Sequence, residues 1–574
     1  MKYLWFGNCL LALALSACTT PTTKQNGNPI RIRWMRDPET LDPLAQPNQY
    51  ATEGINLLHM SLLQLDLQAQ RYAPALAESL PTVRPLNDSL TQLDYRLRPA
   101  ATWDNGRPVL ATDVAFTLKL MNCPGLPHES TRLQFSFIRQ ILLDSADPRH
   151  FRLICQGQAT ENILESGDFP VLSEAALDSA HSLRQFSLAE LVNNRLPAKT
   201  PALVALAKQY QAASLGQRSE YMPGCGPYQF ANWQFNQSLT FKRKKKWWAD
   251  KLRPAPLVLQ AHPQALEFVI LPEDAAAMLA LQRHELDIYP QVSARDFRRL
   301  QASAGAQRDL TFYSGASYDV VYAAFNTQRP MLRDKYTRQA LSCLFDPAGL
   351  LAGTQLGQGS RTVGLLPPSS PYYNDSLALP TYAPAKARGL LRKAGWQLTD
   401  GGWQRPPAQR LALALRYRAN DITFETTALQ FRAAAAQLGI PVELQPTEGT
   451  SFTGALRDGN FDMYVRTLKG NPFTFNFAPV LHSQAIGEGN FMGFKSTAID
   501  RVLENIITAS PTRKRYLLRR FQALLQDEAP LAPLFFSSYR LAASNHLSHL
   551  IPSGIKPGYA ATAIIWVEHP LLAQ

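Results

Sequence analysis

Residues 95–114 have the sequence YRLRPAATWDNGRPVLATDV, which contains the end of a strand, a turn and the start of a helix. Apolar and polar side chains alternate from Leu93 to Arg98, which is the period of a half-buried strand. Asp104-Asn105-Gly106 is a turn sequence, because Asn and Gly tolerate backbone conformations that most residues avoid. Thr112-Asp113 then begins a helix, since a first-turn carboxylate offsets unpaired backbone N–H groups.

Strands and helices alternate on both sides of this stretch, which favours an α/β architecture with mixed sheets. Segments of alternating hydrophobicity predict strands, and segments with apolar residues three and four apart predict helices. We predict strands at 30–34, 320–326, 411–417 and 441–445, a hairpin at 228–233 and 238–243, and helices at 51–65, 274–284, 334–344, 383–394, 423–438, 499–507 and 515–526.

The composition is that of a large globular protein. The chain has 574 residues, 45% of them hydrophobic and 18% charged, which argues against a disordered or fibrous protein and allows about three domains. The net charge is +13, but the one dense basic run, residues 242–246, is interpreted as the end of a surface strand. We therefore expect no nucleic-acid partner, and the diffuse positive charge suits work near an anionic membrane surface.

The N-terminus has the features of an export signal. Met1-Lys2 is followed by a mainly apolar stretch at 3–15, which is too short to span a bilayer. Leu15-Ser16-Ala17-Cys18 resembles the bacterial lipobox, which predicts a signal peptide at 1–17, an acylated Cys18 and a flexible tether at 18–29. The alternative is an ordinary cleaved signal that happens to carry a cysteine.

The remaining cysteines and the histidines do not form a recognisable site. Cys123, Cys155, Cys225 and Cys343 lack zinc spacing, so we expect no metal. Cys123 and Cys155 are compatible with either a disulfide or two buried free thiols. The sequence has no GxSxG, HExxH or GxxxxGK[ST] motif, and we predict no catalytic residues and no cofactor.

Eight segments, in order along the chain, resemble the family 5 extracellular solute-binding proteins, the peptide-, nickel- and oligosaccharide-binding components of bacterial ABC importers. Residues 95–114 are similar to the family signature "F-x-LR-x-x-x-x-W-x-DG-x-P-x-T-A-x-DV", with Ala-Thr in place of Thr-Ala. The other similar segments are the "LDP" turn at 36–43, 74–79, "GCGPY" at 224–228, 325–346, 382–395, "FD" at 461–462 and 521–536.

The resemblance implies an α/β, bilobed clamshell of the type II (cluster C) periplasmic-binding-protein class, with an extra inserted domain. We expect a discontinuous lobe I (30–55, 222–312 and 527–574), an inserted domain (56–221) and a lobe II (313–526). The ligand would bind in the cleft between the lobes, where exclusion of water strengthens a few selective contacts.

One segment departs from the peptide-binding relatives. After "FD" those proteins resemble "W-x-x-D", whose acid pairs with the α-amino group of the ligand, whereas residues 464–472 here contain no acid. Arg466 and Lys469 in this segment favour an anionic or carboxylate-bearing ligand, or else both face solvent. The other candidate ligand-binding residues, each of which could equally serve packing, are Asn48, Gln49, Tyr50, Tyr318 and Tyr322.

The favoured hypothesis is a lipid-anchored, non-enzymatic substrate-binding protein of an ABC importer. It would be a monomer on the periplasm-facing side of the cell envelope that delivers a peptide or peptide-like solute to a permease and its ATPase. The alternatives are a binder of a non-peptide anionic solute and an envelope scaffold or sensor on the same fold. A cell-envelope hydrolase would need a clustered nucleophile and base, which the sequence does not place.

Overall fold

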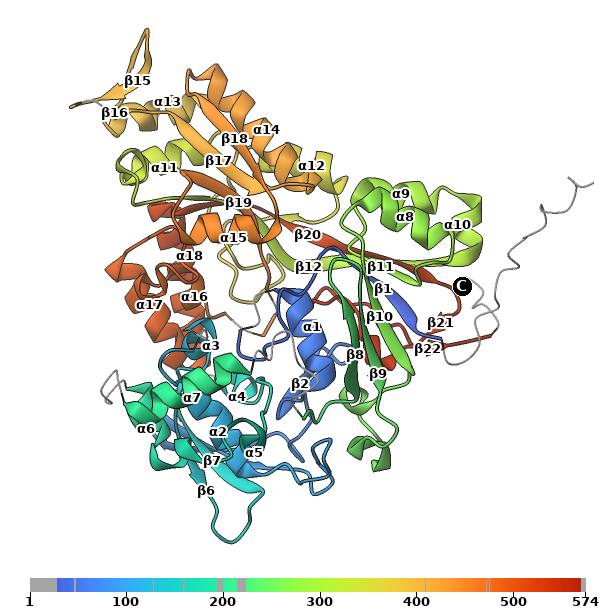
Figure 1. Ribbon diagram of the computed structural model, residues 1–574. Helices are drawn as coiled ribbons and strands as arrows, with labels where there is room; N and C mark the ends of the chain where they lie inside the picture. Colours follow the sequence, from blue (N-terminus) through green and yellow to red (C-terminus); the bar gives the residue numbers. More distant parts are fainter. Residues whose placement is uncertain are drawn as a thin grey trace, which may run out of the picture.

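The computed structural model describes residues 28–568 except 46–47, 127–128, 158–159, 194–199, 214–222, 408, 471 and 474 (Figure 1). The predicted signal peptide and Cys18 lie outside the described residues. Eleven strands form one large mixed sheet, in the order β18-β17-β19-β12-β20-β11-β1-β10-β9-β8, with β13 paired beside β20. The predicted α/β class with mixed sheets is confirmed.

The bounds of these strands follow the chain as β1 Ile30–Trp34, β8 Tyr228–Gln234, β9 Ser238–Arg243, β10 Ala265–Ile270, β11 Ile288–Pro290, β12 Leu310–Phe325, β13 Ser360–Arg361, β17 Leu413–Arg418, β18 Val442–Thr447, β19 Met463–Leu468 and β20 Leu531–Ser544. Strands β1 and β8–β11 come from the segments predicted for lobe I, and β17–β19 come from the segment predicted for lobe II.

Two long antiparallel strands join the halves of this sheet. Strand β12 has 16 residues and β20 has 14, and they pair along most of their length. Their register shifts between Ala316 and Val320, so the pairing is interrupted midway. The two halves of the sheet are therefore connected through a pair of strands whose hydrogen-bond ladder is irregular near its middle.

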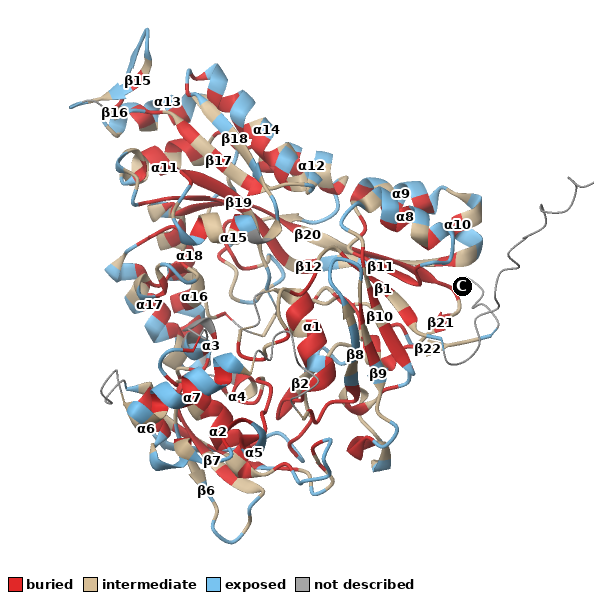
Figure 2. Cartoon of the chain, viewed as in Figure 1, coloured by how far each residue is buried: buried red, intermediate tan, exposed pale blue. Residues whose placement is uncertain are grey.

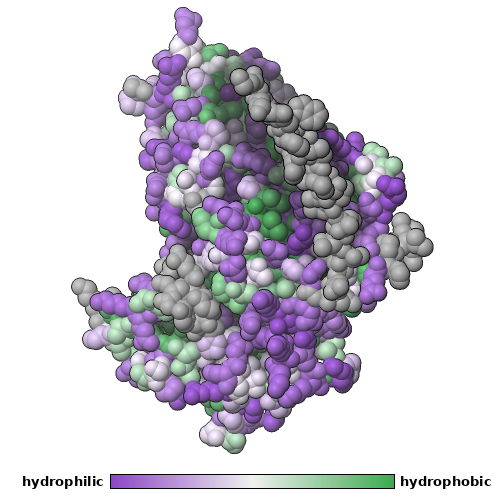
Figure 3. Space-filling model, turned by 45° about the vertical axis from the view of Figure 1, so that its right-hand side comes forward, coloured by the Kyte–Doolittle hydropathy of each residue, from purple (hydrophilic) through white to green (hydrophobic). Residues whose placement is uncertain are grey.

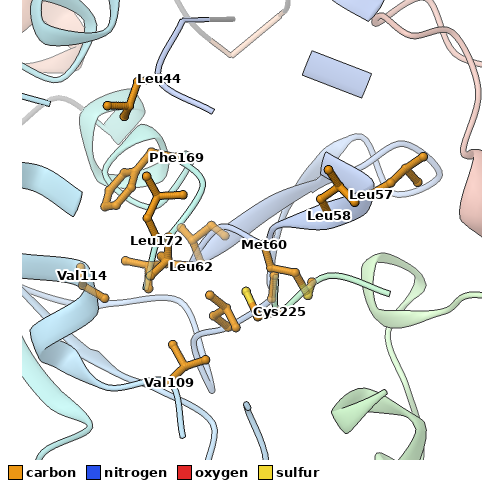
Figure 4. Close-up of a cluster of buried hydrophobic side chains, with 14 of the residues drawn as sticks. Leu44, Leu57, Leu58, Met60, Leu62, Val109, Val114, Phe169, Leu172 and Cys225 are labelled. Carbon is orange, nitrogen blue, oxygen red and sulfur yellow. The ribbon is translucent and has the colours of Figure 1, made fainter. Parts of the chain in front are cut away.

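Residues between β1 and β8 add a second, smaller unit. Its four-stranded antiparallel sheet has the order β4-β5-β7-β6, with bounds β4 Thr82–Asn87, β5 Leu90–Arg96, β6 Ile138–Leu143 and β7 His150–Gln156. A cluster of buried side chains, which includes Leu58, Met60, Leu62 and Cys225, fastens this unit to the large sheet (Figure 4). This unit lies at the bottom of Figure 1.

Helices cover both faces of the large sheet and leave their outer sides exposed (Figure 2). The helices used below are α1 Gln49–Leu58, α2 Ala111–Leu120, α8 Asp274–Gln282, α11 Lys335–Ser342, α12 Pro347–Gln355, α13 Pro384–Lys393, α14 Ile422–Gln437, α15 Gly449–Arg457, α17 Thr497–Thr508 and α18 Pro511–Glu528. No helix in the described part of the chain is long and apolar enough to cross a membrane.

The quoted signature folds as predicted and has a structural role. The Asp113 carboxylate accepts hydrogen bonds from the backbone N–H groups of Leu110 and Glu174, both at 2.9 Å, and from the Trp103 indole at 3.3 Å. The first bond begins α2, and the other two fasten this helix to neighbouring segments. Burial raises the pKa of Asp113, and these donors oppose that shift.

The predicted helix at 51–65 is wrong in its second half. Helix α1 ends at Leu58, and residues Leu63–Asp66 form strand β2. The carbonyl of Leu58 accepts from the N–H of Gly226, and a side chain at Gly224 would lie 2.2 Å from that carbonyl oxygen. The two glycines of "GCGPY" therefore allow the chain to pack against the end of α1.

All four described cysteines are free, so the disulfide alternative for Cys123 and Cys155 is wrong. Cys123, Cys155 and Cys225 are buried, and Cys343 is partly buried. Burial raises the pKa of Cys123 to about 11 and that of Cys225 to about 12. These thiols are therefore held in the protonated, unreactive form.

Candidate functional site

A cavity of about 2090 Å³ lies between the two halves of the large sheet. Its walls include residues that directly follow the carboxyl ends of parallel strands: Met35 and Arg36 after β1, Pro272 after β10, and Glu448 after β18. Strands β17 and β19 contribute their own last residues. Ligands of open α/β sheets bind at these carboxyl ends, so the topology itself builds the site.

On the side of the cavity assigned to lobe I, a carboxyl group of α1 is hydrogen-bonded to two aromatic side chains. Glu53 accepts from the Trp34 indole at 2.9 Å and from the Tyr559 hydroxyl at 2.5 Å. Burial raises the pKa of Glu53 to about 7, although both donors and the charge of Lys469 oppose the shift. This carboxyl group therefore titrates near neutral pH inside the wall of the cavity.

Basic side chains dominate the lobe II wall. Arg418 ends β17, Arg466 is in β19, and Lys469 directly follows β19. Desolvation, together with repulsion from Arg36 and Arg466, lowers the pKa of Arg418 to about 10. The Lys469 side chain remains accessible to solvent within the cavity, yet protein surrounds it and its pKa is lowered to about 7, with Asp319 opposing the shift.

Two polar contacts cross between the walls. The ammonium group of Lys469 donates to the side-chain oxygen of Gln49 at 2.5 Å. Lys556 forms an ion pair with Asp319 at 3.2 Å, and both side chains are largely buried. These contacts link the start of α1 and the C-terminal segment to β19 and β12.

The structure brings six of the seven predicted ligand-binding residues to this cavity. The residues that line it are Asn48, Gln49, Tyr50, Tyr322, Arg466 and Lys469. Tyr318 instead lines an adjacent cavity of about 80 Å³, which Lys469 also borders.

Some of these six also have clear structural roles. The Asn48 side-chain oxygen accepts from the N–H groups of Tyr50 and Ala51 and so begins α1. Tyr50 is buried with its ring 5.3 Å from that of Trp34. Tyr322 is 2% exposed and packs edge-on against Tyr464. Gln49, Arg466 and Lys469 are the predicted residues whose polar atoms are most available to a ligand.

Sequence reasoning missed Arg36, Glu53 and Arg418. Arg36 was within the quoted "LDP" segment, and Arg418 directly followed a predicted strand, at the carboxyl end where open α/β sheets bind their ligands. Glu53 gave no signal, because a carboxylate in a helix usually faces solvent.

The described residues contain no group of three or more His, Cys, Asp or Glu side chains that could hold a metal ion. The face drawn in Figure 3 is mostly hydrophilic, with a group of hydrophobic side chains near its centre. The lining of the cavity itself includes apolar side chains such as Leu57 and Phe452, basic groups and backbone at strand ends, which are the means of holding an organic solute.

Comparison with known proteins agrees with this geometry. A profile described as "Bacterial extracellular solute-binding proteins, family 5 Middle" matches residues 71–485. The oligopeptide-binding protein AppA of Bacillus subtilis is 21% identical over 558 residues, which cover 94% of this chain and 92% of AppA. The nickel-binding periplasmic protein of Escherichia coli is 24% identical over 335 residues, covering 57% of this chain and 62% of that protein.

Solved structures share the fold. The oligopeptide-binding protein from Thermus thermophilus, complexed with a pentapeptide, superposes with a TM-score of 0.77 at 18% identity. The match covers 94% of this chain and 96% of that one. With the type II clamshell and the interlobe cavity in place, the chain belongs to the family 5 bacterial extracellular solute-binding proteins.

Proposed function

We propose that this chain is the substrate-binding lipoprotein of an ABC importer, and that it captures a peptide or peptide-like solute between its lobes. The observation that carries the proposal is the cavity of about 2090 Å³ at the carboxyl ends of the strands. Pockets for drug-sized ligands are roughly 300–1,000 Å³, so this one has room for an extended solute. The oligopeptide-binding relatives named above favour the same class of ligand.

The proposed transport cycle depends on how the chain is divided into two lobes and an inserted domain. We propose lobe I at 30–55, 222–312 and 527–574, the inserted domain at 56–221 and lobe II at 313–526. Closure about the β12–β20 pair would present both lobes in one arrangement to a membrane permease with its ATPase. The relatives are binding proteins, so we infer that this chain releases its solute chemically unchanged.

We also propose that Cys18 is acylated and holds a monomer on the periplasm-facing side of the cell envelope. Residues 1–17 would be removed, and several acyl chains would anchor the protein stably, since each buried methylene contributes about 0.8 kcal/mol. The Cys18→Ser variant tests this step. It should leave the membrane fraction, whereas the unchanged chain should remain there until detergent is added.

Native mass spectrometry tests the binding function. A form beginning at Thr19 is expressed in the periplasm of its own host and measured before and after unfolding. A discrete adduct released on unfolding supports solute capture and gives the mass of the solute. An adduct-free mass, together with no thermal shift across a library of peptides and small solutes, would oppose it and favour an envelope scaffold or sensor.

A further inference from the structure

Two guanidinium groups of the cavity, those of Arg418 and Arg466, lie next to each other. Arg418 and Arg466 lie on adjacent parallel strands, β17 and β19, two residues beyond the paired Arg416 and Tyr464. The two arginines therefore stand side by side on the same face of the sheet. Arg36 approaches from lobe I, two residues beyond the end of β1.

No carboxylate in the described part of the chain forms an ion pair with Arg418 or Arg466. The Arg418 Nε atom is buried without a hydrogen-bond partner. Both guanidinium groups instead lie over aromatic rings, Arg418 at 5.8 Å from the centre of Phe452 and Arg466 at 5.7 Å from that of Phe491. Such stacking orients a guanidinium group but leaves its N–H groups free to donate.

Most of the acidic residues that line the cavity have partners other than Arg418 and Arg466. Asp37 accepts from the Trp233 indole and from the N–H of Asn236, both at 2.6 Å. Asp421 accepts from the N–H groups that begin α14. The remaining partners are Arg33 for Asp274 at 2.8 Å, Arg36 for Glu39 at 3.2 Å, and Lys556 for Asp319 at 3.2 Å.

The basic groups consequently act on one another. Repulsion from Arg36 and Arg466 contributes to the lowered pKa of Arg418, and repulsion from Arg36 and Arg418 contributes to that of Lys469. Attraction from Asp421 opposes the shift at Arg418, and attraction from Asp319 opposes the shift at Lys469. Basic groups that a fold brings together despite their mutual repulsion are typical of a binding site.

We infer that Arg418 and Arg466 bind a doubly charged oxyanion of the transported solute, with Lys469 and Arg36 at its sides. Two unpaired guanidinium groups match two negative charges, and parallel N–H pairs suit the oxygens of a carboxylate or phosphoryl group. The inference rests on the proposed function, because it specifies the solute of the same cavity. The two charges can come from one phosphoryl group or from two neighbouring carboxylates.

Matched tripeptides test this chemistry by isothermal titration calorimetry. Ala-Glu-Glu and Ala-phosphoserine-Ala have charged side chains, whereas their counterparts Ala-Gln-Gln and Ala-Ser-Ala, called the uncharged probes below, have neutral side chains and the same charged termini. At least one charged probe should bind at least ten-fold more tightly than its counterpart, and its affinity should fall as salt is added. Comparing the two charged probes distinguishes a phosphoryl group from paired carboxylates.

Variants localise the effect. Arg418→Gln and Arg466→Gln should each weaken the charged probe at least ten-fold and should weaken its uncharged counterpart much less, so that the difference between the two probes shrinks. Arg432→Gln, on the exposed side of α14 and outside the cavity, is the control and should behave as the parent chain. Arg418→Lys keeps the charge without the paired N–H geometry and should give an intermediate loss, and melting temperatures verify that each variant folds.

The outcomes separate this inference from the proposed function. Equal binding of charged and uncharged probes, or an Arg418→Gln variant that binds charged probes normally, overturns the inference while solute binding stands. If none of the four probes binds but an uncharged or cationic solute is released in the mass-spectrometry experiment, the inference is again wrong. Absence of any bound solute in both experiments opposes the inference and the proposed function together.

Discussion

The ammonium group of Lys469 donates to the side-chain oxygen of Gln49 at 2.5 Å, which joins the end of β19 to the start of α1 across the cavity. The pKa of Lys469 is about 7 because desolvation and the charges of Lys556, Arg36 and Arg418 disfavour its charged form, against the attraction of Asp319. Lys469 therefore loses its charge near neutral pH, and the hydrogen bond to Gln49 loses its charge assistance.

Anion affinity should decline as the pH rises from 6 to 8. The probe is Ala-Glu-Glu with its amino group acetylated, so that no probe group titrates in this range. Deprotonation of Lys469 removes a positive charge, and ionisation of Glu53, whose pKa is also about 7, adds a negative one. Calorimetry should show a loss of roughly three- to ten-fold.

Two single variants divide this pH effect between the groups. Lys469→Met and Glu53→Gln should each show a shallower decline than the parent chain, and the double variant should show almost none. If Lys469→Met retained the full decline, the titration of Lys469 would not govern the affinity.

The contribution of Glu53 to the free energy of unfolding should fall as the pH rises, because Glu53 has a higher pKa in the folded chain than in the unfolded one. The folded protein keeps the Glu53 proton between its ordinary pKa of 4.5 and about 7, so this contribution is present at low pH and is lost across this window. The loss amounts to about 3 kcal/mol. His59 and Lys469, whose pKa values are lowered, contribute in the opposite direction, so the loss is measured by chemical denaturation at pH 5 and pH 8 as the difference between the parent chain and Glu53→Gln.

Asp168 adds a loss of the same sign, since burial raises its pKa from 3.8 to about 6. Glu53→Gln should therefore remove this pH-dependent loss between about pH 4.5 and 7, and Asp168→Asn should remove its own between about pH 3.8 and 6. A profile that Glu53→Gln leaves unchanged would show that Glu53 has an ordinary pKa in the folded chain.

Local sequence predicted the elements whose ends are determined locally. Helix α14 was expected at 423–438 and occupies Ile422–Gln437, because Asp421 accepts from the N–H groups of its first turn. Strand β12 was expected at 320–326 and begins at Leu310 instead. Its extra residues pair with β20, more than two hundred residues away, and no local pattern specifies that pairing.

The same distinction applies to the cavity. Gln49 and Lys469 were each predicted as ligand-binding candidates, but their contact across the cavity joins segments that are 420 residues apart in the sequence. Arg418 was missed because its importance comes from Arg466 on the adjacent strand and from a buried Nε atom that has no hydrogen-bond partner in the described part of the chain. Both are properties of the tertiary structure rather than of sequence spacing.

Arg338 should be among the most sensitive positions of lobe II. Its buried guanidinium group donates to the carbonyls of Leu332, Arg333, Glu528 and Ala529, which ties α11 to the end of α18. Arg338→Ala would leave these acceptors unpaired and should cost about 3–5 kcal/mol in urea denaturation.

Arg338→Lys should recover only part of that loss, since an ammonium group cannot reproduce the planar fork. Arg392→Ala, at an exposed position in α13, is the control and should change stability by less than about 0.5 kcal/mol. Equal effects at the two positions would mean that the buried hydrogen bonds contribute little.

The four described cysteine thiols should be protected from alkylation in the folded chain. Cys123, Cys155 and Cys225 are buried with raised pKa values, and Cys343 is partly buried with its pKa raised by desolvation. Iodoacetamide at pH 8 should modify these four residues slowly before unfolding and all four of them after it, without a reducing agent. A peptide map showing Cys123 linked to Cys155 would contradict the free-thiol state.

Gly157 should be needed for close contact between α17 and the smaller unit that is inserted between β1 and β8, called the inserted unit here. Its φ is +85°, and an added Cβ would lie 2.5 Å from the Thr508 Cα atom. Nearby, the Asn162 side chain donates to the Ile507 carbonyl at 2.6 Å, so the two segments meet along this line. Gly157→Ala should therefore combine backbone strain of roughly 1–2 kcal/mol with a clash that pushes the segments apart.

Gly125→Ala isolates the first of these effects. Gly125 has a φ of +86°, and an added Cβ would meet only the Ala207 Cβ atom at an ordinary 3.7 Å. Both variants should lower the melting temperature, but only Gly157→Ala should increase the radius of gyration in small-angle X-ray scattering and weaken binding of the charged tripeptides. Identical scattering from the two variants would show that the Gly157–Thr508 contact does not hold the inserted unit against lobe II.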